Sequence, residues 1–332
     1  MRYIIVGTGA VGGAIGGRLA EAGHDVVLVA RGAQYEALRT HGLRLITPDG
    51  PRTHALPVVD RPDALDLTPD DVLVLAVKTQ DSVAALDAWS DRPVAGGGTA
   101  GERLPLICAQ NGVESERLAL RRFRRVYGMC VWLPATFVRP GEVSAAGTPL
   151  TGILHLGCYP TGTDTTAELI AADLEKSKLL APVVPDVMRW KYGKLLSNLA
   201  NAVEAVTGPL TGDAAPLVER ALAEGRAVLE AAGIDAVGQE EQSKARGGRM
   251  RFEPLDGSPR GAGSSWQSLT RGTGTIEADY LNGEIVLLGR QHGVPAPVNA
   301  VLQRTANAFA RERREPGSMS VAELTALIDA AC

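Results

Sequence analysis

Three glycines near the N-terminus constrain this chain more than any other feature. Gly7, Gly9 and Gly12 form a G-x-G-x-x-G pattern, preceded by the apolar run 3–6 and followed by apolar residues at helical spacing. Between a strand and a helix, such glycines permit a tight turn, a close backbone approach to a pyrophosphate and close helix–strand packing. The alternative is a glycine-rich turn without a ligand. We expect a dinucleotide to bind the loop formed by Gly7, Thr8, Gly9, Ala10, Val11 and Gly12.

Further apolar runs alternate with helical stretches along the first half of the chain. Residues 26–29, 72–77 and 104–108 are typical of strands buried on both faces. Strands that alternate with helices form a parallel sheet through right-handed crossovers. The sequence therefore predicts an α/β fold with a doubly wound, Rossmann-type sheet, which residues 128–134 and 152–156 extend.

The pattern changes near residue 184. The 332 residues suggest two domains, which we place at 1–183 for dinucleotide binding and 184–332 for an all-helical substrate and catalytic domain. Long helices are expected at 187–207, 214–232, 275–292 and 297–313. Residues 92–103 are expected to form a loop, and the glycine- and arginine-rich stretch 238–264 a mobile loop.

The residue after the second strand indicates which dinucleotide binds. An acidic residue there would accept a hydrogen bond from the ribose 2′-hydroxyl of NAD, but this chain has Arg31. A guanidinium pairs with a 2′-phosphate, so we expect NADP(H) as cofactor; the alternative is a solvent-exposed arginine.

Lys78 and Asn111 follow the third and fourth expected strands. Ligands bind outside the carboxyl ends of parallel strands, so both side chains are expected in the cofactor crevice, with Asn111 also reaching the substrate. The alternatives are a surface lysine and a turn-forming Asn-Gly pair.

A polar stripe marks the predicted helix 187–206. Lys191, Lys194, Asn198 and Asn201 recur at spacings of three, four and three residues, which places them on one face at about 100° per residue. Asparagine is a poor helix former, so the amides are expected to face a ligand. A lysine in such a cleft can donate a proton to a carbonyl oxygen while hydride arrives at carbon. Ser265 and Glu277 are further candidates, although a first-turn Glu is also favoured by the helix dipole.

Composition excludes several other classes of protein. The net charge of −4 and the lack of a basic stripe argue against nucleic-acid binding. The four cysteines are widely spaced and form no C-x-x-C pair, which argues against a metal site and fits a reducing compartment. We expect a cytoplasmic protein with no metal, no membrane association and a small-molecule substrate.

Taken together, these motifs resemble the ketopantoate reductase (2-dehydropantoate 2-reductase) family. The similar segments run in family order over nearly the whole chain: 7–12, Arg31, 76–79, 110–112, 194–198, 264–265 and 276–283. The resemblance implies a Rossmann domain followed by a helical domain like that of 6-phosphogluconate dehydrogenase. It implies NADPH-dependent reduction of ketopantoate or a related 2-oxo acid in pantothenate biosynthesis, and it is compatible with a homodimer.

The resemblance also implies residue roles. Lys194 is the general acid, Glu277 binds the substrate hydroxyl, and Asn198 and Ser265 contact the substrate. The family's second helix asparagine falls on Ala202 here, while Asn201 precedes it, and Trp266 replaces a methionine. Whether Asn201 takes over as a substrate contact is open, as is ketopantoate itself. The remaining alternatives are a family reductase of another small carbonyl compound and a non-catalytic NADPH-binding protein.

Overall fold

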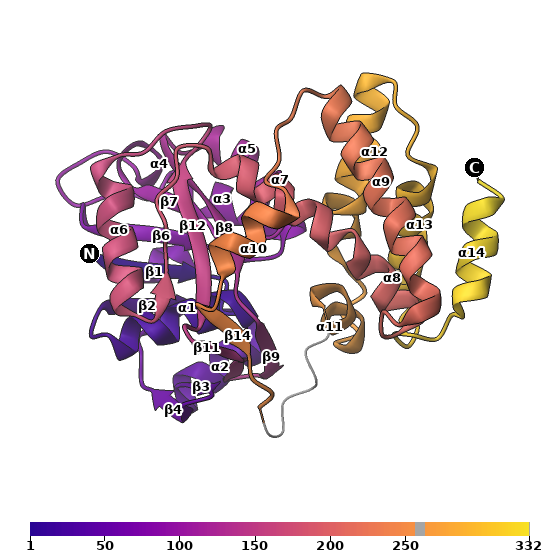
Figure 1. Cartoon of the computed structure of the whole chain (residues 1–332). Helices are drawn as coiled ribbons and strands as arrows, with labels where there is room; N and C mark the ends of the chain where they lie inside the picture. Colours follow the sequence, from indigo (N-terminus) through magenta and orange to yellow (C-terminus); the bar gives the residue numbers. More distant parts are fainter. Residues whose placement is uncertain (256–262, 332) are drawn as a thin grey trace. The chain divides into compact units, whose positions relative to one another are not determined.

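The chain forms two compact units. The computed structural model describes residues 1–255 and 263–331 (Figure 1). The first unit contains Met1–Trp190 and the described part of Glu240–Gly261, and the second contains Lys191–Gln239 and the described part of Ala262–Cys332.

An eight-stranded sheet forms the centre of the first unit. Its strand order is β13-β12-β8-β7-β6-β1-β2-β5, and every neighbouring pair is parallel except β8 and β12. The strands are β1 Arg2–Val6, β2 Asp25–Val29, β5 Val58–Val59, β6 Asp71–Leu75, β7 Pro105–Cys108, β8 Arg125–Trp132, β12 Gly152–Cys158 and β13 Leu179–Leu180. The predicted Rossmann-type sheet is confirmed, including its extension by β8 and β12.

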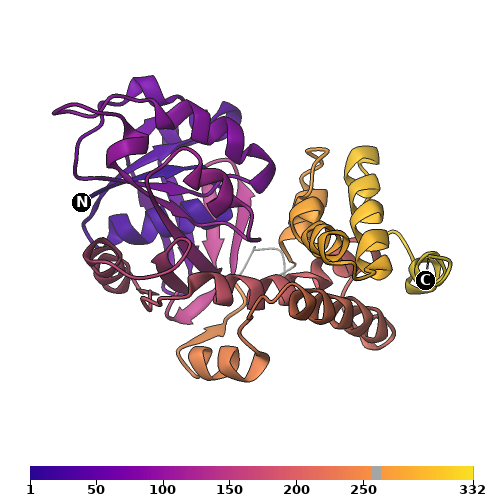
Figure 2. The ribbon, with the colours of Figure 1, turned by 90° about the horizontal axis from the view of Figure 1, so that it is seen from above.

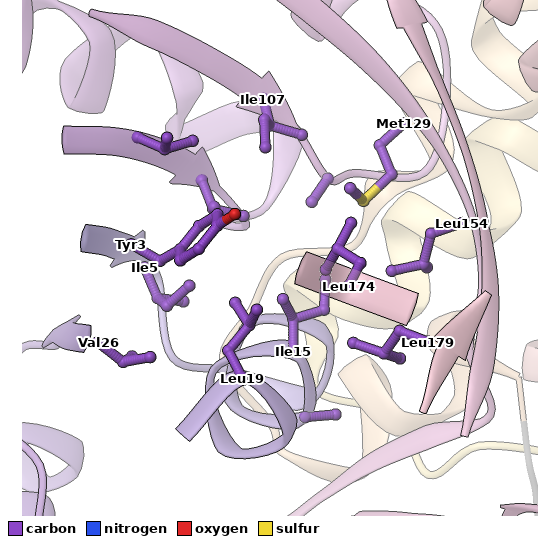
Figure 3. Packing of buried hydrophobic residues seen from close by; sticks show 14 of the residues in the cluster. Tyr3, Ile5, Ile15, Leu19, Val26, Ile107, Met129, Leu154, Leu174 and Leu179 are labelled. Atoms are coloured by element: carbon purple, nitrogen blue, oxygen red, sulfur yellow. The ribbon is translucent and has the colours of Figure 1, made fainter. Parts of the chain in front are cut away.

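Alternate residues of each strand enter different apolar cores. Tyr3 and Ile5 of β1 pack with α1 and α6 on one face (Figure 3), whereas Ile4 and Val6 pack with α3 and α5 on the other. Burial on both faces explains the continuous apolar runs in the sequence. The helices of this unit are α1 Ala10–Glu21, α2 Gly32–His41, α3 Ser82–Ser90, α4 Ala100–Arg103, α5 Ser115–Leu120 and α6 Thr165–Lys176, with 3-10 turns η1 Pro62–Ala64 and η2 Thr79–Asp81.

Several short elements of the first unit differ from the sequence prediction. The stretch 92–103 ends in helix α4, because Thr99 and Glu102 form a capping box. A second sheet, which the sequence did not predict, has the order β4-β3-β10-β9. Its strands are β3 Leu43–Thr47, β4 Gly50–His54, β9 Ala135–Arg139 and β10 Glu142–Ala145.

The predicted mobile loop 238–264 is wrong for most of its length. It contains helix α10, Gln239–Arg246, and strand β14, Met250–Phe252, which pairs with β11, Gly147–Pro149; residues 256–262 of this prediction lie outside the described residues. Ala245 and Met250 pack against a cluster around Cys130 and Trp132, so burial of apolar side chains orders this segment. Beside this cluster, the rings of His155 and Trp190 are stacked, with their centroids 3.8 Å apart.

The second unit is helical. Helices α9, α12 and α13 pack against one another (Figures 1 and 2). Among the described residues, no helix has both the length and the apolar character needed to cross a membrane. The elements are α7 Val187–Asn198, which begins in the first unit, then α8 Ala200–Thr207, α9 Ala215–Ala231, α11 Ser264–Thr270, α12 Asn282–His292, α13 Pro297–Glu312 and α14 Val321–Asp329, with 3-10 turns η3 Gly212–Ala214 and η4 Glu277–Tyr280.

Two helices that the sequence predicts as continuous are interrupted. The predicted helix 187–206 divides into α7 and α8 at Leu199, where the backbone keeps helical angles (φ −61°, ψ −29°) and Leu199 N donates to Leu196 O at 3.2 Å. The carbonyl oxygen of Leu199 accepts a hydrogen bond from Asn282 Nδ2 at 3.1 Å. The predicted helix 275–292 divides into η4 and α12 at Leu281, where the backbone leaves the helical region with φ −113° and ψ −91°. The interruption at Leu199 therefore coincides with a contact between segments distant in the sequence, which local periodicity cannot reveal.

Candidate active site

Four parallel strands of the first unit end level with one another. Val6 pairs with both Val29 and Leu75, and Leu75 pairs with Cys108. Because β1 lies between β2 and β6, the sheet changes its winding direction there, and ligands bind outside the carboxyl ends of strands at such a point. The predicted residues that follow these strands along this edge are Gly7, Arg31, Lys78 and Asn111.

The glycine loop is tightly packed on one side and open on the other. Gly7 has φ +101°, and a Cβ there would lie 2.7 Å from Val77 N. A Cβ at Gly12 would overlap the Gly7 carbonyl oxygen, whereas a Cβ at Gly9 would have no neighbour within 4 Å. The N-cap residue of α1 is Gly9, which has no side chain to cap the helix. The first N–H groups of the helix are therefore available to an anion on the open side.

Thr8 and Gln34 add polar groups to this loop. Thr8 is 3% exposed, and its hydroxyl oxygen is buried with no hydrogen-bond partner among the described residues. Gln34 of α2 donates from Nε2 to Thr8 O and accepts at Oε1 from Gly141 N, both at 2.8 Å. An open helix N-terminus beside an orphaned hydroxyl fits the pyrophosphate of a dinucleotide.

The other predicted cofactor residues lie at turns beyond β2, β6 and β7. Arg31 is exposed and is the N-cap residue of α2, while Lys78 is half-buried at the start of η2. Asn111 is half-buried beyond β7. Gln110 Nε2 donates to Val77 O and to Ser82 Oγ, both at 2.8 Å, which ties the turn after β6 to the turn after β7.

A second set of polar residues lies on α7 in the second unit. Lys191 is buried, Lys194 is half-buried, and Asn198 is 9% exposed. The Asn198 Nδ2 atom is buried and has no hydrogen-bond partner among residues 1–255 and 263–331. Leaving a buried donor unsatisfied costs about 1–3 kcal/mol, so this amide is suited to an acceptor supplied by a ligand.

Asn201 and Glu204 of α8 face the start of α11. Asn201 Nδ2 lies 3.5 Å from Ser264 Oγ, and Glu204 Oε2 accepts a hydrogen bond from Gly263 N at 2.9 Å. Burial raises the pKa of Glu204, and the Gly263 hydrogen bond opposes that shift. Ser265, the next residue, is 4% exposed. The amide of Asn201 is thus directed at α11, and its predicted substrate contact, like that of Ser265, remains a prediction.

Glu277 belongs to the short turn η4 and not to the first turn of a long helix. It is 5% exposed, and its negative charge opposes the desolvation that lowers the pKa of Arg271. Arg271 Nη2 also donates to Ser268 Oγ at 3.2 Å. A cation from the end of α11 therefore lies within electrostatic range of the predicted catalytic carboxylate.

Sequence reasoning missed several residues that shape these two sets. Glu204 and Arg271 had no local signal, and Gln34 was hidden because its two partners are distant in the sequence. No group of three His, Cys, Asp or Glu side chains suited to a metal ion occurs in residues 1–255 and 263–331.

Two family models match the chain. The model for ketopantoate reductase PanE/ApbA covers residues 3–161, and the model for its C-terminal domain covers residues 186–310. The chain belongs to this family. The 2-dehydropantoate 2-reductase of Mesorhizobium japonicum is 31% identical over an alignment of 335 positions, gaps included, that covers 91% of this chain and 96% of the relative. That of Archaeoglobus fulgidus is 30% identical over an alignment of 313 positions that covers 91% of this chain and 95% of the relative.

Solved structures agree with this ketopantoate reductase fold. The ketopantoate reductase of Ralstonia eutropha JMP134 has a TM-score of 0.77 at 25% identity, over 95% of this chain and 100% of that one. A D-mandelate dehydrogenase with NADH and anilino(oxo)acetate also has a TM-score of 0.77, at 21% identity over 94% and 99% of the two chains, which shows a shared fold. The expected family, the fold and the oxidoreductase class are confirmed, and a nicotinamide cofactor is supported.

Proposed function

We propose that this chain reduces ketopantoate, or a closely related 2-oxo acid, to the 2-hydroxy acid with NADPH. The observation that carries the proposal is the presence on α7 of Lys194 and, four residues later, Asn198, whose buried Nδ2 has no partner in the part of the chain that the structure describes. A proton donor and an amide donor on one helix face suit a carbonyl oxygen that gains a proton. The curated relatives are named 2-dehydropantoate 2-reductases, which supports ketopantoate as the substrate.

The cofactor preference rests on Arg31. Its exposed guanidinium follows β2, where an NAD-specific site would have a carboxylate, and it is available to a 2′-phosphate. NADPH supplies a hydride to the substrate carbon when it is bound. In this proposal residues Gly7–Gly12 hold the pyrophosphate, Thr8 Oγ donates a hydrogen bond to a phosphate oxygen, and Lys78 and Asn111 contact the rest of the cofactor and the substrate.

The residues of the second unit handle the proton and the substrate. Lys194 donates the proton to the carbonyl oxygen, and Asn198 donates a hydrogen bond from Nδ2 that orients the substrate. Ser265 binds the substrate, and Glu277 accepts a hydrogen bond from its hydroxyl group. The amide of Asn201 is directed at Ser264, so we propose that Asn201 supports substrate binding through α11 and does not contact the substrate itself.

A substrate panel tests the proposal. NADPH oxidation at 340 nm would be followed with ketopantoate, pyruvate, 2-oxoisovalerate and phenylglyoxylate. We expect the highest kcat/KM with ketopantoate or another branched 2-oxo acid. If NADPH binds and none of these compounds is turned over, the chain is a non-catalytic NADPH-binding protein and the proposed reaction is wrong.

A second candidate substrate class is an aromatic 2-oxo acid. The D-mandelate dehydrogenase with the same fold is described as holding NADH and anilino(oxo)acetate. In this chain Trp266 takes the place of the family's methionine, but its ring packs against Gly317, where a Cβ would lie 3.1 Å from it. Higher kcat/KM with phenylglyoxylate than with ketopantoate would favour this second class.

We base the proposed oligomeric state, compartment and pathway on the family. The ketopantoate reductase of Staphylococcus aureus is described as dimeric, with a TM-score of 0.69 at 17% identity, and we propose a homodimer for this chain. We also propose that the reaction takes place in the cytoplasm as a step of pantothenate biosynthesis. Light scattering on the purified protein tests the dimer.

A further inference from the structure

We propose that Asn282 is a positioning residue that aligns the turn carrying Glu277 with the helix end carrying Lys194 and Asn198. The inference deepens the proposed function and rests on it, because it assigns a role to a residue that touches neither cofactor nor substrate. Asn282 is the first residue of α12 and is 1% exposed.

The side-chain amide of Asn282 makes two buried hydrogen bonds to other parts of the second unit. Its Nδ2 atom donates to Leu199 O at 3.1 Å and to Asn299 Oδ1 at 3.0 Å. Leu199 directly follows Asn198 and is the residue at which α7 gives way to α8. Both N–H groups of the amide are therefore used, and one of them fixes the backbone beside the proposed substrate amide.

Asn299, whose Oδ1 accepts a hydrogen bond from Asn282, is itself held in place by hydrogen bonds to α9. Its Nδ2 atom donates to Ala221 O at 3.0 Å and to Glu224 Oε2 at 2.9 Å, and its backbone N donates to the same carboxylate oxygen at 2.9 Å. Asn299 is fully buried. With its donors directed at α9, its side-chain oxygen is left as an acceptor for Asn282, which defines how the Asn282 amide is oriented.

The turn carrying Glu277 has a second anchor. Asp279 Oδ1 accepts hydrogen bonds from Gln303 Nε2 at 2.7 Å and from Asn307 Nδ2 at 2.6 Å, both on α13. A Cβ at Gly283 would lie 2.8 Å from Gln303 Nε2, so the glycine after Asn282 leaves room for this contact. The turn is held to α13 by Asp279, and the start of α12, which follows the turn, is held to the α7–α8 junction by Asn282.

This connection has a catalytic consequence. Glu277 lies five residues before Asn282, and Asn198 lies one residue before Leu199. A single amide thus joins the backbone beside Asn198 to the start of α12, which follows the turn that carries Glu277 after one intervening residue. A shift of about 1 Å between such groups can lower a rate by about 100-fold, so the loss of Asn282 should reduce kcat more than it reduces cofactor affinity.

Kinetics of three variants test the role. Asn282→Ala should lower kcat with ketopantoate by about 10-fold to 100-fold, while the Kd of NADPH stays near the wild-type value. Asn282→Ser retains one hydrogen-bond donor, so its kcat should lie between those of the wild type and Asn282→Ala. Leu324→Ala removes a fully buried side chain of α14 and serves as the matched destabilised control, with kcat expected to remain near wild type.

Hydrogen–deuterium exchange provides a readout that needs no turnover. In Asn282→Ala and Asn282→Ser, peptides covering 199–204 and 276–281 should lose protection together, whereas Leu324→Ala should leave both unchanged. Unchanged kcat in a folded Asn282→Ala protein, or faster exchange in only one of the two peptides, would overturn the inference. If the wild type turns over no 2-oxo acid, the proposed function fails, and the exchange experiment still decides whether Asn282 links the two segments.

Discussion

The glycine loop of the first unit and the polar set of the second unit are built in different ways. The loop consists of consecutive residues, and its form is set by backbone geometry at Gly7, Gly9 and Gly12. The polar set consists of side chains from α7, α11 and the turn η4, which are far apart in the sequence. Only packing among helices can align the second set.

This difference decides how each region responds to change. In a backbone-built site, an atom added to a glycine affects either the stability of the protein, as at Gly12, or the space left for the ligand, as at Gly9. A side-chain-built site loses one chemical role with each substitution, and it also depends on residues, such as Glu204 and Asn282, that only hold other groups in place.

The largest expected loss of activity comes from a substitution in the second unit. Lys194→Ala should lower kcat by about 100-fold to 10,000-fold, because a positioned proton donor contributes that much. The Kd of NADPH, measured by fluorescence titration, should stay within about twofold if the two regions act separately. Lys244→Ala on α10, an exposed lysine, is the matched control and should keep full activity. Full turnover by Lys194→Ala would remove the proposed general acid.

Two glycine substitutions test the backbone-built site. Gly12→Ala places a Cβ against the Gly7 carbonyl oxygen and should destabilise the protein by about 1–3 kcal/mol. Gly9 has φ −78° and open space around it, so Gly9→Ala should leave the melting temperature unchanged. Its methyl group would instead occupy space needed by the pyrophosphate and raise the Kd of NADPH by about 10-fold or more. Wild-type NADPH affinity in Gly9→Ala would contradict cofactor binding at this loop.

Arg31 tests cofactor preference within the first unit. A hydrogen bond to a charged group is worth about 1.5–3 kcal/mol, so Arg31→Ala should raise the Kd of NADPH by about 10-fold to 100-fold. The Kd of NADH should change by less than about twofold, because NADH has no 2′-phosphate. Tighter binding of NADH than NADPH by the wild type would refute the proposed preference.

Acid should destabilise the first unit through His155. Burial, with a smaller contribution from the charge of Arg249, lowers the pKa of His155 from 6.5 to about 4. The unfolded chain then binds more protons between these values, so stability falls by about 3 kcal/mol as the pH drops from 6.5 to 4. His155→Phe should reduce this fall in denaturant titrations at the two pH values. An equal fall in both proteins would contradict the assignment.

Glu204 in the second unit should change stability with pH in the opposite direction from His155. Of the effects predicted here, this one should be the smallest. Its folded pKa is raised above the ordinary 4.5, so its stabilising contribution is present below pH 4.5 and is lost as the pH rises through the raised pKa. Glu204→Gln keeps an acceptor for Gly263 N and should remove this loss. The melting temperature of the variant minus that of the wild type should therefore increase between pH 4 and pH 8; a difference that stays constant or decreases would contradict the prediction.

The sequence by itself determined the parts of this protein that depend on local order. The continuous apolar runs indicated strands buried on both faces, and G-x-G-x-x-G between a strand and a helix indicated the dinucleotide loop. Arg31 and the spacing of Lys194 and Asn198 could also be identified, because neighbours in the sequence define a turn or a helix face. The family resemblance assigned substrate-binding roles to Glu277 and Ser265, which were already candidates.

Only the tertiary structure decided where the long helices are interrupted and what Asn201 faces. The break at Leu199 coincides with a hydrogen bond from Asn282, and the order of 239–252 depends on apolar packing against the cluster around Trp132. Asn201 lies beside Ser264, 63 residues further along the chain. Such contacts join segments that are distant in the sequence, and their energy depends on burial and on donor–acceptor geometry, which local periodicity does not contain.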